Sequence, residues 1–177
     1  MRGGDVPTDC WGWLFYVGRK LLYLPRLLHL TRGCSEGLTP LTAFDNALRD
    51  AGIDNLNLVK VSSIVPKGAS FGPRPELPVG TVVPTVYAHI VSNVPGEIVS
   101  AVIAAGVGEH GGVLMEYHHR GTAENAERIV TAMVEEGFER RGWKLDDVKY
   151  ATAEHKVDRL GCATAAVLLL DSEEVTP

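Results

Sequence analysis

The sequence predicts an α+β fold in which β-strands form a layered sandwich with helices. Apolar residues recur either in alternation or in short continuous runs, which is typical of strands. These strands come in runs with a helical pattern at the end of each run, and they do not alternate one by one with helices. The chain has 177 residues, 45% apolar and 22% charged, which fits one globular domain.

The first predicted element is a helix over residues 39–53. Thr39 is a good N-cap, Pro40 suits the first helical position, and Gly52 is a good stop signal. The apolar positions recur at helical spacing and make one face of the helix: Leu41, Phe44, Leu48 and Ala51.

A strand over residues 55–63 and a long loop over residues 63–80 follow. The strand is predicted from alternating apolar and β-branched residues, and the loop from its many prolines and glycines. A loop of this length in a compact domain is usually functional or disordered. The remaining predicted elements are strands over 81–92, 97–107 and 111–119, a helix capped by Thr122 over 122–143, and strands over 148–157 and 162–170.

Residues 1–32 are expected to be an N-terminal extension and lead-in, and residues 33–177 the folded domain. The apolar stretch over residues 10–30 is interrupted by glycine, proline and charged residues. Its uncharged runs are shorter than the roughly 20 residues that a membrane span needs. The charges follow the first apolar run, whereas in a signal peptide they precede it. We expect residues 1–20 to be poorly ordered or covered by a partner.

Composition excludes several classes of protein. A net charge of −5 argues against nucleic acid as the main partner, because phosphate binding needs a basic face. The three cysteines are far apart and form no CxxC pair, which indicates neither a zinc site nor a disulfide framework and fits a cytoplasmic protein. The histidines show no metal-ligand spacing, and no nucleotide-binding motif occurs, so we predict no metal site.

Two carboxylates and a serine pair are the candidates for chemistry. Glu116 lies in a predicted strand among apolar residues, either facing water at a sheet edge or kept protonated by an apolar setting as a proton donor. Asp45, at the rim of the apolar helix face, is either solvated or a receptor for a cation. Ser62 and Ser63 are either strand residues near an edge or a place where the chain reacts with itself.

Five short motifs in order resemble those of one family: SSIVP, PGE, MEY, GFERRGW and LGCA. Together with the stretch GCSEGLTPLTAFDNALRDAGIDNLNLVKV, they resemble the pyruvoyl-dependent arginine decarboxylases, small archaeal and bacterial enzymes that make their own cofactor by self-cleavage. The resemblance covers about residues 33–170.

The resemblance implies self-cleavage between Ser62 and Ser63 into a β chain, 1–62, and an α chain, 63–177. The Ser63 hydroxyl would attack the Ser62 carbonyl carbon, and elimination with loss of ammonia would leave a pyruvoyl group at position 63. Asn57 matches the asparagine that supports this step. Because residues 57 and 63 are roughly 20 Å apart on an extended strand, we expect Asn57 to serve a neighbouring subunit. The family is similar in this respect, since it assembles as trimers with active sites between subunits.

For the reaction, the resemblance implies that the pyruvoyl group takes up electrons when CO₂ leaves, and that Glu116 then protonates the α-carbon. Asp45 would bind the guanidinium group, Leu48 the aliphatic stem, and Ser62 would end the β chain beside the site. The expectation is an αββα, trimeric decarboxylase that converts L-arginine to agmatine and CO₂ for polyamine biosynthesis, with no metal or free cofactor. The alternatives are a decarboxylase of another basic amino acid and an uncleaved relative that acts as a binding subunit.

Overall fold

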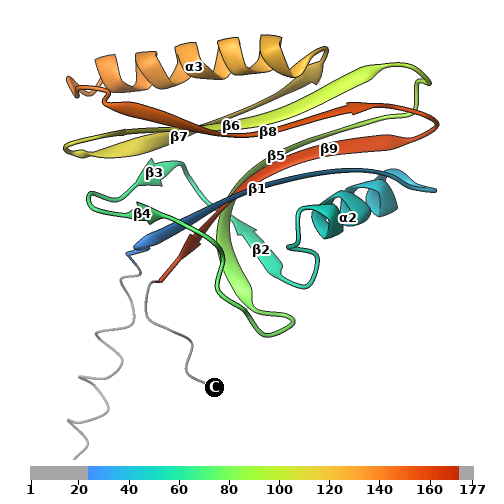
Figure 1. Cartoon of the computed structure of the whole chain (residues 1–177), viewed down its shortest axis with the longest axis horizontal. Helices are drawn as coiled ribbons and strands as arrows, with labels where there is room; N and C mark the ends of the chain where they lie inside the picture. The colour runs from blue at the N-terminus through green and yellow to red at the C-terminus, as the bar shows by residue number, and fades with distance from the viewer. Residues whose placement is uncertain (1–23, 172–177) are drawn as a thin grey trace, which may run out of the picture.

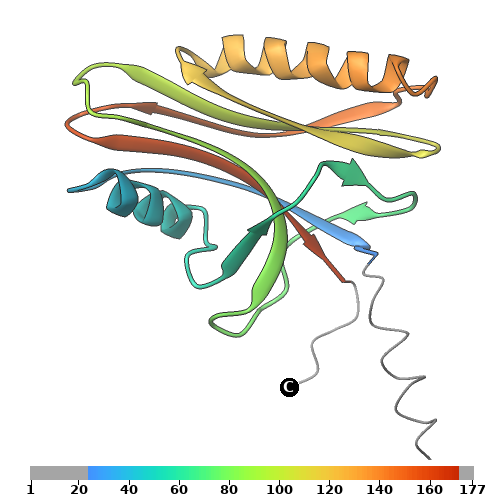
Figure 2. The ribbon, with the colours of Figure 1, turned by 180° about the vertical axis from the view of Figure 1, so that it is seen from behind.

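The computed structural model describes residues 24–171, which form four layers. Two β-sheets, A and B, lie face to face (Figures 1 and 2). Helix α2 (Pro40–Asp50) covers the outer face of sheet A, and helix α3 (Ala123–Glu139) covers the outer face of sheet B. This arrangement confirms the predicted α+β class and is that of a layered sandwich with two helices and two sheets.

Sheet A has the strand order β2-β5-β9-β1-β4. Its strands are β1 (Leu27–Glu36), β2 (Asn57–Lys60), β4 (Ser70–Phe71), β5 (Val82–Ser92) and β9 (Gly161–Leu170). All ten residues of the central strand β9 are buried, because α2 covers one face and sheet B covers the other. This double cover explains why the strand is a continuous apolar run without alternation.

Sheet B has the strand order β3-β7-β6-β8. Its strands are β3 (Ile64–Val65), β6 (Ile98–Gly108), β7 (Gly111–Arg120) and β8 (Asp147–Lys156). The three long strands are antiparallel neighbours, and the short β3 pairs with the first residues of β7 at one edge of the sheet.

The two helices begin as predicted, but only one of them is capped as predicted. The Thr39 hydroxyl accepts from the Thr42 N–H at 3.2 Å, and the Thr42 hydroxyl accepts in return from the Thr39 N–H at 2.9 Å. Thr122 holds the N-cap position of α3, but its side chain makes no capping hydrogen bond. The Glu154 carboxylate of β8 accepts from the Ala123 N–H instead, at 2.6 Å.

Three expectations about the first half of the chain need correction. Strand β1 was not predicted, and the expected domain boundary between residues 32 and 33 falls inside it. The strand expected over 55–63 ends at Lys60, so the serine pair lies outside it. The expected loop 63–80 contains β3 and β4, because its segments pair with β7 and β1.

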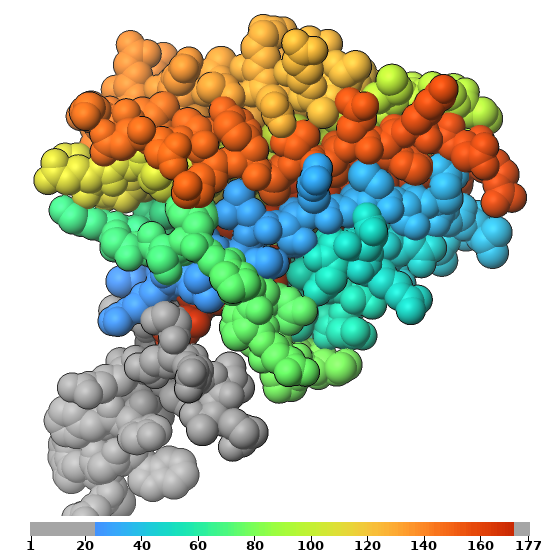
Figure 3. Space-filling model, viewed as in Figure 1, coloured from blue at the N-terminus to red at the C-terminus, as the bar shows by residue number. Residues whose placement is uncertain are grey.

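The segment between β3 and β5 is held against the rest of the molecule. In the space-filling view these residues, drawn in green, run past β1 to α2 (Figure 3). The Ser70 N–H donates to the Arg26 carbonyl at 2.8 Å, and Arg74 Nη2 donates to the Gly52 carbonyl at 3.1 Å. The expectation for residues 1–20 concerns a part of the chain outside the described residues. No helix in residues 24–171 is long and apolar enough to cross a membrane.

Glu36, the last residue of β1, ties this strand to the turn between β8 and β9. Its carboxylate accepts from the backbone N–H groups of Asp158, Arg159 and Leu160 at 3.0, 3.0 and 2.7 Å, and lies 2.6 Å from Nε2 of His155. Burial alone would raise the pKa of this carboxyl, but the hydrogen bonds outweigh it and lower the pKa from 4.5 to about 2.

Candidate active site

Ser62 and Ser63 lie in the short connection between the two sheets. Strand β2, which ends at Lys60, is one edge strand of sheet A, and β3, which begins at Ile64, is one edge strand of sheet B. The connection therefore passes from one sheet to the other at the side of the sandwich where β2 and β3 lie, which we call the open side. Sheet A contains strands from both sides of the Ser62–Ser63 bond, whereas every strand of sheet B follows the bond in the chain.

Ser63 is held at its carbonyl and free at its hydroxyl. Its carbonyl accepts from the N–H of Leu114 in β7 at 2.9 Å, which continues the pairing of β3 with β7. Neither serine hydroxyl has a hydrogen-bond partner within residues 24–171, and Ser62 is exposed to solvent. A fixed backbone with an unengaged hydroxyl suits a nucleophilic attack on the neighbouring peptide.

Glu116 faces sheet A from β7, at the end of the buried part of this face. It lies two residues beyond the fully buried Leu114 on the same side of the strand. Its Oε1 is 2.6 Å from the Nζ of Lys60, while its Oε2 is buried and has no partner within the described residues. With its side chain 30% exposed, Glu116 matches neither expected setting fully, because its setting is partly closed and contains a cation.

Lys60 is the residue at this site that the sequence analysis missed. Its ammonium group donates to the carbonyl of Tyr87 in β5 at 3.1 Å and lies 5.1 Å from the centre of the Tyr87 ring. Lys60 therefore links the edge of sheet A to Glu116 on sheet B, two residues before the serine pair. The sequence does show a lysine in a strand just before the serines, which could have indicated a role at the site. Its partner Glu116, however, lies 56 positions away in the sequence.

A row of rings connects Tyr87 with helix α2. The ring of Phe44 in α2 lies 6.2 Å from that of Tyr87 and 4.3 Å from that of His89. Partial burial lowers the pKa of His89, and the charges of His118 and Lys60 lower it further. Burial and the charges of His118 and Lys60 therefore all favour the neutral state of His89.

The other predicted site residues do not meet the serines within one chain. Asp45 is exposed on α2, and its carboxylate forms no hydrogen bond or ion pair within residues 24–171. Leu48 is half-buried in the apolar layer between α2 and sheet A, to which Tyr87 also belongs. Asn57 begins β2, at the end away from the serines, and its Nδ2 donates to the Gly80 carbonyl at 2.7 Å.

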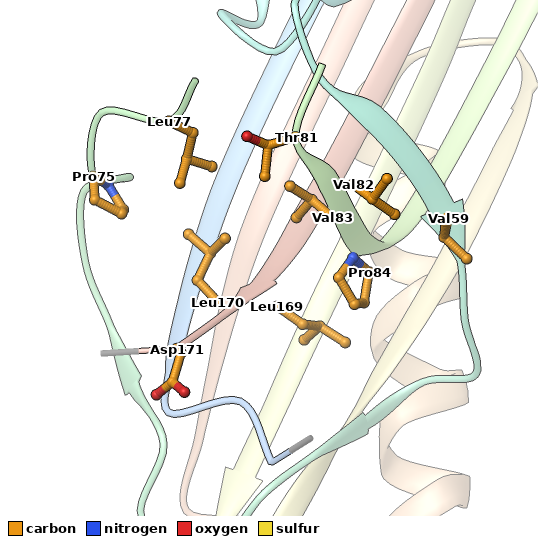
Figure 4. Close-up of a pocket in the computed structure, with 10 residues that line it drawn as sticks. All are labelled: Val59, Pro75, Leu77, Thr81, Val82, Val83, Pro84, Leu169, Leu170 and Asp171. Carbon is orange, nitrogen blue, oxygen red and sulfur yellow. The ribbon is translucent and has the colours of Figure 1, made fainter. Parts of the chain in front are cut away.

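Two adjoining apolar hollows lie near this site, and Ser62 lines one of them. The first has a volume of about 360 Å³, and its lining includes Val61, Ser62 and Ile64. The second, of about 400 Å³, shares Pro84 and Leu169 with the first and opens between β2, the start of β5 and the end of β9 (Figure 4). Within residues 24–171, no three side chains of the metal-binding types come together to hold a metal ion.

Comparison with known proteins identifies the family of this chain. The family model for pyruvoyl-dependent arginine decarboxylase matches residues 27–174. The chain belongs to the pyruvoyl-dependent arginine decarboxylase family. The matched region begins at the first residue of β1, and thus includes the strand that the sequence analysis missed.

Curated relatives carry the name of the family. A pyruvoyl-dependent arginine decarboxylase from Methanocaldococcus jannaschii is 47% identical over 149 residues, covering 82% of this chain and 90% of the relative. Relatives of the same name from Thermococcus sibiricus and Pyrococcus abyssi are 46% and 44% identical, covering 82% of this chain and 96% and 95% of theirs.

Proposed function

We propose that this chain cleaves itself between Ser62 and Ser63 and then converts L-arginine to agmatine and CO₂, a step toward polyamines. Membership of the family supports the reaction and the substrate. The observation that carries the site assignment is the position of the serine pair, in a connection between two sheets with Glu116 beside it.

The surroundings of Ser63 fit a pyruvoyl group formed in place. Attack of the Ser63 hydroxyl on the Ser62 carbonyl carbon converts the peptide bond to an ester, and elimination breaks the ester to free the Ser62 carboxylate. The dehydroalanine left at position 63 takes up water and releases ammonia, which gives the pyruvoyl group. The Leu114 N–H, which binds the Ser63 carbonyl at 2.9 Å, would hold this group at the start of β3.

The residues around Ser63 have separate roles in the decarboxylation. A pyruvoyl carbonyl supplies an electron sink for the electron pair that remains when CO₂ leaves the α-carbon. Glu116 delivers a proton to that carbon, and the unpartnered Oε2 is the oxygen suited to carry it. The new carboxylate of Ser62 lies beside the substrate at the end of the β chain.

Asp45 and Leu48 are assigned to the side chain of the substrate. The Asp45 carboxylate has no partner within residues 24–171 and can pair bidentately with a planar guanidinium group. Leu48 offers apolar surface one turn further along α2. Arginine, lysine and ornithine should be compared as substrates. A clear preference for lysine or ornithine would favour the alternative of another basic amino acid and remove the guanidinium role of Asp45.

A homotrimer with active sites between subunits explains the separation of the site residues. Asp45 and Asn57 make no hydrogen bond or ion pair with Ser62, Ser63 or Glu116 in one chain, so a neighbouring subunit would bring them together. Several large apolar side chains near β2 and the serines are exposed, which is typical of an interaction surface: Val59, Ile64, Val79 and Val82.

Intact mass under denaturing conditions, together with an assay for agmatine, tests the proposal. The wild-type chain should give two fragments that meet at 62/63, with the larger fragment lighter by one ammonia than hydrolysis predicts. The Ser63→Ala variant should stay in one piece and be inactive, because it lacks the nucleophile. Cleavage of Ser63→Ala, or an intact wild-type chain that makes no agmatine, would contradict the proposal and favour a non-catalytic relative.

A further inference from the structure

We propose that Lys60 is a positioning residue for Glu116, and that it returns the proton that Glu116 gives to the substrate. This inference deepens the proposed function and rests on Glu116 acting as the proton donor of the decarboxylation.

The contacts of Lys60 fix the orientation of the Glu116 carboxyl. The ammonium group is held from the sheet A side by the Tyr87 carbonyl at 3.1 Å and by the face of the Tyr87 ring at 5.1 Å. It reaches across the open side of the sandwich to Oε1 of Glu116 at 2.6 Å. Because Oε1 is engaged by Lys60, the buried Oε2 is the oxygen left to face a reacting atom.

The proton balance of the reaction gives Lys60 a second task. Decarboxylation replaces the carboxylate on the α-carbon with one proton, so each turnover takes up one proton from solvent. After Glu116 has given its proton, its negative charge lies beside the Lys60 ammonium, which stabilises it. Lys60 is half exposed, at 50%, so it can pass a proton to Oε1 of Glu116 and regain one from water. Once Lys60 has given up its proton and its charge, the ion pair no longer holds the carboxyl group, which turns to bring the new proton to the side of the substrate.

Other titratable groups lie at the same edge and do not make this contact. Burial lowers the pKa of His89 in β5, and the charges of His118 in β7 and of Lys60 lower it further, which places these groups near one another. Neither histidine forms a hydrogen bond with Glu116 within the described residues. Lys60 is thus the residue placed to exchange a proton with Glu116 directly.

A double-mutant cycle tests this role with Lys60→Met, Lys60→Arg, Glu116→Gln and the combination of Lys60→Met with Glu116→Gln. Lys149→Met is the matched control, because Lys149 is also about half exposed and ion-paired, but to Asp147 on β8. All variants should self-cleave by intact mass. Lys60→Met should lower kcat by about 10- to 100-fold with little change in KM, and Lys60→Arg should retain more activity.

The double variant should be no slower than Glu116→Gln alone, because Lys60 acts through Glu116. Lys149→Met should match the wild type. Independent, additive losses would overturn the proposal, and so would full activity of Lys60→Met. A failure of Lys60→Met to self-cleave would also overturn it, since the ion pair would then serve maturation.

A second readout does not depend on the pyruvoyl group. In the uncut Ser63→Ala chain, the ¹⁵Nζ resonance of Lys60 should shift when Glu116 is changed to Gln, while that of Lys149 should not. An unchanged Lys60 resonance would overturn the contact itself. If the wild type neither cleaved nor made agmatine, the proposed function would fail, whereas this measurement would still decide on the ion pair.

Discussion

On one face of β7, three alternate residues pass from the interior to solvent. Leu114 is fully buried, the Glu116 side chain is 30% exposed, and His118 is exposed. Glu116 therefore lies at the depth where a substrate can reach its carboxyl while one oxygen stays out of water. A proton donor needs this combination, because access and partial shielding together allow transfer to a carbon atom.

Glu116→Gln should separate maturation from turnover. The amide keeps the shape of the side chain but cannot donate an acidic proton, so self-cleavage should proceed and decarboxylation should slow by about 100-fold or more. Intact mass and the initial rate of agmatine formation measure the two steps. Glu136→Gln on the exposed side of α3 is the control and should behave as wild type. Full activity of Glu116→Gln would remove Glu116 from the mechanism.

At the scale of elements, Glu36 joins the end of β1 to the turn between β8 and β9 and makes stability depend on pH. Because folding lowers the pKa of its carboxyl from 4.5 to about 2, the ionised form is favoured in the folded state. The stabilisation is fully present above about pH 4.5 and is lost as the pH falls toward 2. The Glu36 side chain is 27% exposed, so solvent screening reduces the effect.

Glu36→Gln should therefore destabilise the folded chain by roughly 1–2 kcal/mol at pH 7, and by less at pH 3. Urea unfolding of the uncut Ser63→Ala chain at both pH values measures this, because the uncut chain avoids the complication of two fragments. Glu136→Gln serves again as the control. An equal loss of stability at both pH values would show that the charge of Glu36 does not cause it.

Local sequence patterns predicted the long elements well, but they predicted poorly the strands that depend on pairing with distant parts of the chain. Helix α3 and strands β5 to β9 have strong periodicity or long apolar runs, and each was expected close to its observed bounds. Strand β1 carries histidine and arginine among its apolar residues, and it is defined by ten paired positions with β9, far away in the sequence. For the same reason Lys60 was missed, because its role depends on Glu116 and Tyr87 on other strands.

The serine pair and both carboxylates could be singled out from the sequence because they interrupt apolar patterns. The resemblance then gave each a role. The sequence could not show the route of the chain around Ser62. There the chain leaves sheet A after β2 and enters sheet B at β3. That route follows from the pairing of β2 with β5 and of β3 with β7, neither of which is local.

At the scale of the whole molecule, the exposed apolar side chains near β2 make a prediction about assembly. Val82, at the start of β5, is 64% exposed, and a glutamate there should break an apolar contact between subunits. Val82→Glu should be monomeric by native mass spectrometry and should cleave slowly, because Asn57 of a neighbour would be missing. Val94→Glu, in the turn beyond the other end of β5, is the control and should remain a trimer. A trimeric Val82→Glu, or a monomeric wild type, would contradict this arrangement.

The composite nature of sheet A has a consequence for the lifetime of the protein. Before cleavage, β1 and β2 belong to the same chain as β5 and β9, so folding is a first-order event that does not depend on concentration. After cleavage at Ser62, the same sheet would have to be rebuilt from two separate polypeptides, in a second-order process that dilution slows. When a mature protomer unfolds in a dilute solution, its β and α chains would therefore diffuse apart and would not reassociate. Activity would return only through new synthesis of the uncut chain.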